Sequence, residues 1–335
     1  MLASSFQNGV KLWPTEAITS NSSHNPNSLR EISILQHNAP VDRVRFHPTD
    51  PSLLCTTVED KSVQLWDIRD RSTQRCLSKI QLKSSRGKCA ASVEWQKSGT
   101  ANHLVVTEKD NAVRVYDVRK LNKNATQASK GKGGTAEVKS FQFDNILADT
   151  HFSPSGTHLV SAARRINDGM GIIHIYPWQS GDIDADGQTF VGHTGPIYAL
   201  KFSPDGKHLA TGGNDALVGL WDVKSMVCTA TIARKTKFIR SVAFSHDSKV
   251  VACCSEEKGV HLADVTGRDI GSVSLEKKND SSDRNRSRSL NVGPFGSDEI
   301  TFHPKVHIIA CARGENLGPN VPQVSIARLQ YSETQ

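Results

Sequence analysis

The sequence predicts an all-β fold built from small antiparallel sheets that repeat along the chain. Short apolar runs alternate with polar residues, as in VDRVRF at 41–46 and SVQLWDI at 62–68. Aromatic residues make up only 6% of the 335 residues, whereas turn-forming residues are frequent, with 24 glycines and 13 prolines. A strand-turn-strand pattern recurs through the chain, and this recurrence defines the architecture.

Composition excludes several classes of protein. The apolar runs, such as 104–106 and 308–312, fall far short of the roughly 20 residues that span a bilayer. The first residues have neither a basic segment nor a long apolar one, so we expect no secretory signal. The seven cysteines are odd in number and form no CxxC motif. We therefore expect small buried side chains in a reducing compartment, with neither a disulfide framework nor a metal site.

One stretch organises the chain: LATGGNDALVGLWD, residues 209–222. It recurs as LLCTTVEDKSVQLWD at 53–67 and LVVTEKDNAVRVYD at 104–117, with weaker copies ending at Tyr176, Asp264 and Ala327. Each copy follows an aromatic residue at a turn, and these aromatics lie 42 to 58 residues apart: Phe46, Trp95, Phe152, Phe202, Phe244 and Phe302. That period is typical of a four-stranded propeller blade with loop insertions.

A single blade of this kind cannot bury both of its faces, whereas a ring of blades buries them against each other. Six full copies and a fragment at 2–13 predict a seven-bladed β-propeller, forming one domain over 1–335, with an incomplete first blade. The predicted blades are 2–13 (partial), 37–76, 89–119, 147–178, 193–231, 239–275 and 298–330. Polar segments at 122–136 and 276–292 are predicted to be disordered insertions.

The ends of the chain suggest an open junction. Residues 2–13 supply the second and third strands of a blade, the inner strand before them is absent, and few residues follow Ala327. We expect the ring to be incomplete where the first and last blades meet. Either the chain is part of a longer product or a partner covers the exposed edge.

The copies resemble WD repeats. In that family a histidine, a serine or threonine, an aspartate and the tryptophan form a buried hydrogen-bonded tetrad within a blade. The resemblance places two such sets here: His37, Thr56, Asp60 and Trp66, and His193, Thr211, Asp215 and Trp221. Spacing is shared, because each aspartate lies six and each threonine ten residues before its tryptophan. Repetition favours a structural device over a catalytic triad, which would occur once and face a pocket.

Two copies have lost the tryptophan, since Ala263 and Ala327 stand in its place. We expect those blades to pack less rigidly. No glycine-rich phosphate loop, HExxH motif or nucleophile elbow occurs in the sequence. The sequence therefore predicts no enzyme, no catalytic residues and no cofactor.

Two segments are candidates for RNA contact in a chain of net charge +7. Segment 276–289 interleaves basic residues with serines, a composition that suits weak phosphate binding and control by phosphorylation. Its candidate RNA-binding residues are Lys277, Lys278, Arg284, Arg286 and Arg288. Segment 69–88 holds seven basic residues against one acidic and could meet RNA or an acidic partner. The alternative for both is a solvated surface without a partner.

A closer resemblance covers residues 195–312. The stretches 202–228, 239–265 and 300–312 resemble the family of the WD-repeat third subunit of the THO complex. Shared features include DALV before the tryptophan, VC after it, the FSHD turn and ADV where the tryptophan is lost. The resemblance implies a nuclear, non-catalytic scaffold coupling transcription to mRNA processing and export. Its partners would be other subunits of an mRNA export complex, with weak RNA contact, no membrane and no small-molecule substrate. The short N-terminus and the 276–289 insertion depart from the family.

A second function remains open. WDIR at 66–69 and YDVR at 116–119 resemble the WDxR box of propellers recruited to cullin-type ubiquitin ligases. The alternative is therefore a WD-repeat substrate receptor of such a ligase.

Overall fold

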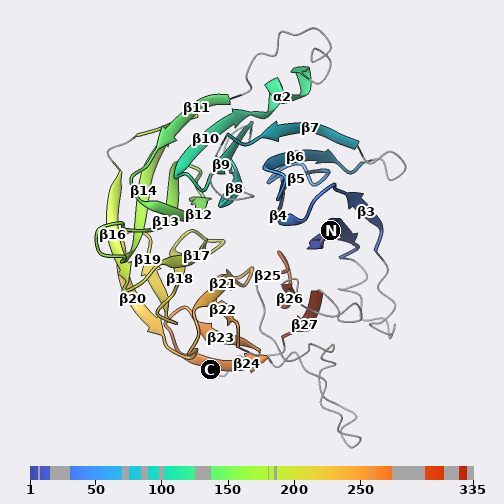
Figure 1. Ribbon diagram of the computed structural model, residues 1–335. Coiled ribbons are helices and arrows are strands. Elements are labelled where there is room, and N and C mark those ends of the chain that lie inside the picture. Colours follow the sequence, from blue (N-terminus) through green and yellow to red (C-terminus); the bar gives the residue numbers. More distant parts are fainter. Residues whose placement is uncertain are drawn as a thin grey trace, which may run out of the picture. The chain divides into compact units, whose positions relative to one another are not determined.

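The computed structural model describes most of the chain: residues 1–6, 8–15, 31–69, 75–83, 90–97, 102–124, 137–179, 181–184, 187–257, 259–273, 299–312 and 324–329. Among these residues, the regular elements other than helix α2 (Val118–Asn124) are strands that pair with antiparallel neighbours. The described strands form seven sheets, and the fold class is the predicted all-β, seven-bladed β-propeller (Figure 1). In the described part of the chain, no helix is long and apolar enough to cross a bilayer.

The first three sheets follow one another along the chain. The first sheet has three strands, β1 (Leu2–Phe6), β2 (Gly9–Trp13) and β3 (Ser33–Gln36). The second has four, β4 (Val41–Phe46), β5 (Leu53–Val58), β6 (Ser62–Asp67) and β7 (Arg75–Gln81). The third also has four, β8 (Ser92–Trp95), β9 (His103–Thr107), β10 (Ala112–Asp117) and β11 (Glu137–Gln142).

The remaining sheets repeat the pattern. The fourth holds β12 (Ile146–Phe152), β13 (His158–Arg164), β14 (Gly171–Gln179), β15 (Asp182–Ile183) and β16 (Gln188–His193), with both β15 and β16 paired to β14. The fifth holds β17 (Ile197–Phe202), β18 (His208–Gly213), β19 (Val218–Asp222) and β20 (Val227–Ile232). The sixth holds β21 (Ile239–Phe244), β22 (Val250–Ser255), β23 (Val260–Asp264) and β24 (Asp269–Val273). The seventh holds β25 (Glu299–Phe302), β26 (Ile308–Ala312) and β27 (Val324–Arg328).

Several predicted boundaries need correction. The first blade does not end at residue 13, because β3 pairs with β2. The third does not end at residue 119, because β11 pairs with β10 beyond the predicted insertion. Helix α2 occupies the first three residues of that insertion, 122–124, and its other residues lie outside the described part of the chain. The insertion at 276–292 lies wholly outside it.

Within the described residues the first blade lacks one strand, as predicted. Strands β1 and β2 correspond in the repeat to β5 and β6, and no described strand corresponds to β4. In the seventh sheet, the described residues supply three strands. The open junction between the first and last blades stays a prediction.

The chain divides into two compact units, Met1–Asn167 with Ile173–Thr189, and Asp168–Ile172 with Phe190–Gln335. The single domain over 1–335 stays a prediction. The division carries no sequence signal because it passes through β14 and β16 rather than through a Gly/Pro-rich linker.

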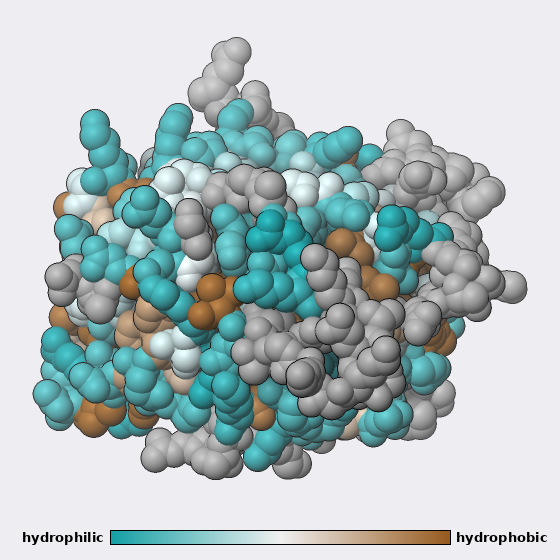
Figure 2. All heavy atoms as spheres, turned by 90° about the horizontal axis from the view of Figure 1, so that it is seen from above, coloured by the Kyte–Doolittle hydropathy of each residue, from teal (hydrophilic) through white to brown (hydrophobic). Residues whose placement is uncertain are grey.

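Apolar cores lie between successive sheets within each unit. Neighbouring residues of β5 point to opposite faces, so Leu54 packs with Val10 and Leu12 of the first sheet while Cys55 packs with Val93 of the third. In the second unit, one core joins the fifth and sixth sheets and another joins the sixth and seventh. Each interior sheet is thus apolar on both faces. On the face shown in Figure 2, hydrophobic residues form small separate groups among hydrophilic ones.

The predicted turns form between the first two strands of a sheet. In FSPDG, Gly206 has a φ of 73° and donates its backbone N–H to the Ser203 carbonyl at 3.0 Å. Glycine suits this conformation because it has no Cβ. The equivalent turn of the sixth sheet is FSHDS, where Ser248 adopts a φ of 61° without that freedom.

Candidate functional site

The fifth sheet holds a complete hydrogen-bonded tetrad. Nδ1 of His193 lies 2.9 Å from Oδ1 of Asp215, and Nε2 lies 2.8 Å from Oγ1 of Thr211. The indole Nε1 of Trp221 donates to the same threonine oxygen at 3.0 Å. A carboxylate accepts hydrogen bonds, so we assign the imidazole proton to Nδ1. Nε2 then accepts the threonine hydroxyl proton, and the chain of donors and acceptors is satisfied throughout.

The tetrad holds its carboxylate ionised. Burial alone raises the pKa of Asp215, but hydrogen bonding and charge from His193, with backbone N–H groups of Leu217 and Thr194, bring it below the ordinary value of 3.8. His193 and Thr211 are 4% and 0% exposed. This closed arrangement fits a structural role, since each polar atom is already engaged by another member of the set.

Two glycines make room for the tetrad. A Cβ on Gly213 would lie 2.4 Å from Nδ1 of His193 and 2.5 Å from Oδ1 of Asp215. A Cβ on Gly219 would lie 2.9 Å from Nε1 of Trp221. Neither approach is sterically tolerable without a shift, so the motif requires glycine at these two strand positions as well as its polar members.

The second sheet holds only three members of its predicted set. Nε2 of His37 lies 2.9 Å from Oγ1 of Thr56, and Trp66 donates to that oxygen at 3.2 Å. Nδ1 of His37, however, donates to the Leu35 carbonyl at 3.1 Å. The fourth predicted member, Asp60, takes no part in a hydrogen bond to His37.

The reason lies in the strand register. Val58 pairs with Val41 as Gly213 pairs with Ile197, so Val58 occupies the position that must be glycine in the fifth sheet. Its Cβ stands where the histidine and aspartate would meet. Asp60 instead accepts from Lys79 Nζ at 2.6 Å and from the Ser62 hydroxyl.

The His37 ring loses the anionic support that His193 has. Burial lowers the pKa of His37 below its ordinary value, and the Leu35 carbonyl and the charge of Asp60 offset this only in part. The sequence spacing alone could not reveal the difference between the two sets, because both have their four polar residues at the same positions.

The sixth sheet replaces the tetrad by an ion pair. Lys235 stands nine residues before Phe244, where the histidine would be, and its Nζ lies 3.9 Å from Oε2 of Glu257. Glu257 also accepts from the backbone N–H groups of Thr236 and Lys237, at 2.6 and 3.1 Å. Ala263, in place of tryptophan, is fully buried in the core. In the sixth sheet, an ion pair therefore takes the place that the hydrogen-bonded tetrad has in the fifth sheet.

A buried charged cluster that the sequence analysis missed lies on the first strands of the second, third and fourth sheets. His151 on β12 lies 3.0 Å from Oδ2 of Asp149 through Nε2, and 3.3 Å from Oε2 of Glu94 on β8 through Nδ1. Arg43 on β4 lies 3.8 Å from Asp149, and Lys97 lies 3.6 Å from Glu94. In the sequence, this cluster could have been suspected only from titratable residues at inward strand positions in ASVEW (91–95) and ADTHF (148–152).

Two carboxylates beside a histidine could in principle move protons. Here each carboxylate also has a cation beside it, and His151 is only 3% exposed. A substrate has no access to that ring. We interpret the cluster as the electrostatic connection between three neighbouring strands of the first unit.

The two WDxR-like boxes adopt one geometry. Nε of Arg69 donates to both carboxylate oxygens of Asp67 at 2.9 Å, and Nε of Arg119 donates to Asp117 at 3.0 Å. The arginine side chains are 68% and 63% exposed. Arg268 forms a related pair with Asp264 at 3.1 Å and is 77% exposed. These arginines are presented to solvent in fixed orientations.

The candidate RNA-binding residues, Lys277, Lys278, Arg284, Arg286 and Arg288, all lie outside the described residues. Of the basic segment 69–88, the structure describes 69 and 75–83. Lys79 in that segment pairs with Asp60, and Lys83 pairs with Glu137 at 2.7 Å. These two lysines are therefore engaged within the chain.

The described cysteines form no disulfide bond with one another, and Cys55, Cys253, Cys254 and Cys311 are buried. Burial raises the pKa of Cys55 to about 12 and that of Cys253 to about 11. Such thiols stay protonated and act as small apolar side chains.

Three segments match the family model described as "WD domain, G-beta repeat": residues 29–67, 186–222 and 226–264. These segments contain the His37 set, the His193 tetrad and the Lys235–Glu257 pair. The predicted resemblance to WD repeats is confirmed.

Three relatives illustrate the similarity at the level of whole chains. THO complex subunit 3 of Arabidopsis thaliana is 24% identical over 275 residues, which cover 82% of this chain and 75% of that protein. WD repeat-containing protein AAC3 of Dictyostelium discoideum is 26% identical over 218 residues, covering 64% of this chain and 40% of that one. Transcriptional corepressor LEUNIG_HOMOLOG of Arabidopsis thaliana is 23% identical over 266 residues, covering 78% and 28%. The chain spans less than half of the last two proteins.

The tetrad geometry predicts different costs for two aspartates at equivalent positions. Asp215→Ala leaves His193 Nδ1 without its acceptor in a buried site, so we expect a loss of about 1 to 3 kcal/mol in the free energy of unfolding. Asp60→Ala removes a surface pair with Lys79 and should cost less than about 1 kcal/mol. Urea unfolding of both variants measures the difference, and equal losses would contradict the assigned geometry.

The Asp215 contribution depends on pH with a defined sign. The folded pKa of Asp215 lies below its ordinary value of 3.8, so the stabilisation is fully present above that value. It is lost as the pH falls through the folded pKa. The gap in stability between wild type and Asp215→Ala should therefore be constant near neutral pH and close in strong acid.

The buried cluster predicts an energetic coupling. His151→Phe leaves Glu94 and Asp149 facing one another with one partner fewer, so we expect a loss of about 3 kcal/mol. Adding Asp149→Asn should then cost less than it does in the wild type, since it removes one of the two charges. A double-mutant cycle by urea unfolding measures the coupling. Strictly additive losses would show that the three groups do not interact.

Proposed function

We propose that this chain is a non-catalytic scaffold subunit of a THO-type complex, acting in the nucleus to couple transcription to mRNA processing and export. Its partners are the other subunits of that complex, and it needs no cofactor. The observation that carries the proposal is the similarity to THO complex subunit 3, which extends over most of both chains.

The described polar sites support a scaffold rather than an enzyme. The His193 tetrad, the His37 set and the Glu94–His151–Asp149 cluster are closed networks of buried groups, which leaves them no free role in catalysis. WD-repeat similarity points the same way, to a platform for protein–protein interaction.

Exposed apolar side chains offer contact points for protein partners. Val138 on β11, Val227 on β20 and Ile270 on β24 are 39%, 56% and 39% exposed. Each lies on the last strand of its sheet, where the outer backbone edge is also accessible. Such strands suit the docking of another protein chain along a blade edge.

The second candidate is a substrate receptor of a cullin-type ubiquitin ligase. It is favoured by one observation, the shared geometry of the Asp67–Arg69 and Asp117–Arg119 pairs in consecutive sheets. In the ligase receptor these arginines would contact the ligase, whereas in the THO-type scaffold they need contact no partner.

Affinity purification of the tagged chain from nuclear extract tests the two functions. We expect THO subunits to co-purify after ribonuclease treatment, because the contacts proposed are between proteins. The double variant Arg69→Ala/Arg119→Ala should retain those subunits. Arg268→Ala is the matched control, since it also removes an exposed arginine paired with aspartate. Capture of a cullin and its adaptor, lost in the double variant but kept in the control, would overturn the proposal in favour of the ligase.

RNA contact by segment 276–289 is a separate prediction. Arg284→Ala/Arg286→Ala/Arg288→Ala should weaken binding to single-stranded RNA at low salt. Because three phosphate contacts are removed, the slope of log K against log salt should flatten by about 2. The control variant Arg119→Ala/Arg234→Ala/Arg268→Ala has the same change in charge at arginines that are paired with aspartates outside both candidate segments. Equal affinities and slopes for wild type and the loop variant would assign the loop to solvent.

A further inference from the structure

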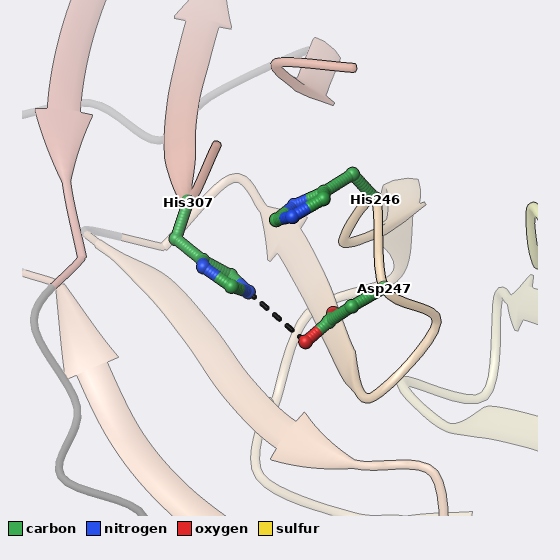
Figure 3. A group of neighbouring side chains, drawn as sticks. All are labelled: His246, Asp247 and His307. Atoms are coloured by element: carbon green, nitrogen blue, oxygen red, sulfur yellow. Dashed lines mark hydrogen bonds and ion pairs between the residues drawn. The ribbon is translucent and has the colours of Figure 1, made fainter. Parts of the chain in front are cut away.

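Two histidines and an aspartate converge between the sixth and seventh sheets (Figure 3). His246 and Asp247 lie in the turn between β21 and β22, and His307 lies directly before β26. One ligand-type atom of each residue lies within 4.8 Å of the others. All three residues are partly buried, with side-chain exposures of 23% for Asp247 and 26% for His307. The sequence analysis predicted no metal site.

The spacing of the three groups is close to that of ligands around one ion. Nε2 of His307 lies 3.2 Å from Oδ2 of Asp247. In tetrahedral zinc sites, bonds of about 2.0 Å place neighbouring ligand atoms about 3.3 Å apart. The imidazoles of His246 and His307 meet edge to face, with ring centroids 4.4 Å apart. A small shift of the His246 ring would complete three corners of a tetrahedron.

The carboxylate of Asp247 is prepared to be an anionic ligand. It accepts hydrogen bonds from the Ser245 hydroxyl at 2.5 Å and from the backbone N–H of Lys249 at 3.2 Å. The bonds from Ser245 and Lys249 go to Oδ1. They fix the carboxylate and leave Oδ2 directed at His307.

His246 has an unused nitrogen. Its Nδ1 is buried and has no hydrogen-bond partner in the described part of the chain. An unpartnered buried polar atom is costly, so it calls for an explanation such as a bound ion. The equivalent turn of the fifth sheet binds its aspartate, Asp205, through Ser203 and the backbone of Lys207 in the same way. There, however, Pro204 stands in the place of His246.

We propose that His246, Asp247 and His307 bind a divalent transition-metal ion, with Zn²⁺ as the physiological ion, leaving the fourth position to water. Two histidines and one carboxylate form a donor set of the kind that Zn²⁺ accepts. The ion would connect the turn after β21 to the strand β26. It would therefore join the three described strands of the seventh sheet to the four-stranded sixth sheet and stabilise that end of the second unit.

Zinc titration of the full chain tests the proposal, after removal of metals with a chelator. We expect one Zn²⁺ per chain by calorimetry and an increase in the melting temperature that grows with zinc concentration. Changing groups that only orient a ligand weakens binding about 10- to 100-fold, so His246→Ala and His307→Ala should each cost at least about 100-fold in affinity. Co²⁺ in place of zinc should give visible absorption bands that both variants lose.

His208→Ala is the matched control. His208 is the first residue of β18, the second strand of the fifth sheet, and it belongs to no group of three metal-type ligands among the described residues. This variant should bind zinc as the wild type does. The proposal is overturned if the wild type takes up no zinc. It is equally overturned if His246→Ala and His307→Ala, shown to be folded by circular dichroism, bind zinc as tightly as the wild type, which would place the ion elsewhere.

Discussion

The two-sided burial of each interior sheet is the constraint on which the rest of the structure depends. Leu54 and Cys55 are neighbours in β5, yet they enter two different apolar cores, one shared with the first sheet and one with the third. Ala252 and Cys253 are likewise neighbours in β22 of the second unit, and they enter the core shared with the seventh sheet and the core shared with the fifth sheet. A sheet with two apolar faces is unstable alone, so each blade depends on its neighbours. This dependence explains why the sequence repeats a unit rather than building one large core.

Polar side chains are tolerated in such sheets only where partners satisfy them, and the chain solves that problem in three ways. The fifth sheet uses the hydrogen-bonded His193 tetrad, which needs Gly213 to let histidine and aspartate meet. The sixth uses the Lys235–Glu257 ion pair. The first strands of the first unit share a cluster centred on His151. The common requirement is satisfaction of buried polar atoms, and the tetrad is one of its solutions.

The repeat made the fold predictable, because the spacing of turn aromatics and the alternation of apolar residues reflect local strand geometry. Strands β3 and β11 escaped prediction since each follows a long segment that breaks the spacing. Asp60 was assigned to a tetrad from its position in the repeat. The Cβ of Val58 occupies the space where His37 and Asp60 would meet, and Asp60 binds Lys79 instead. The cluster at His246, Asp247 and His307 also escaped prediction, because His307 lies 60 residues after Asp247 and the two meet only when the sixth and seventh sheets pack. Residue spacing predicts contacts within one repeat, whereas contacts between repeats can be identified only from the structure.

Partner binding in such a molecule is limited to the parts of the chain that are not buried between two sheets. Strand interiors are committed to the cores and their polar networks, so a partner can reach only turns, outer strands and loops. The described chain carries specific chemistry at these places. Arg69 and Arg119 are held in solvent by aspartates, and Val227 and Ile270 are exposed on outer strands. Because surface residues are free of the packing constraint, two propellers with the same cores can bind unrelated partners. Similarity in the repeats therefore supports the fold directly, and the proposed assignment to a THO-type complex depends on similarity that extends over 82% of this chain.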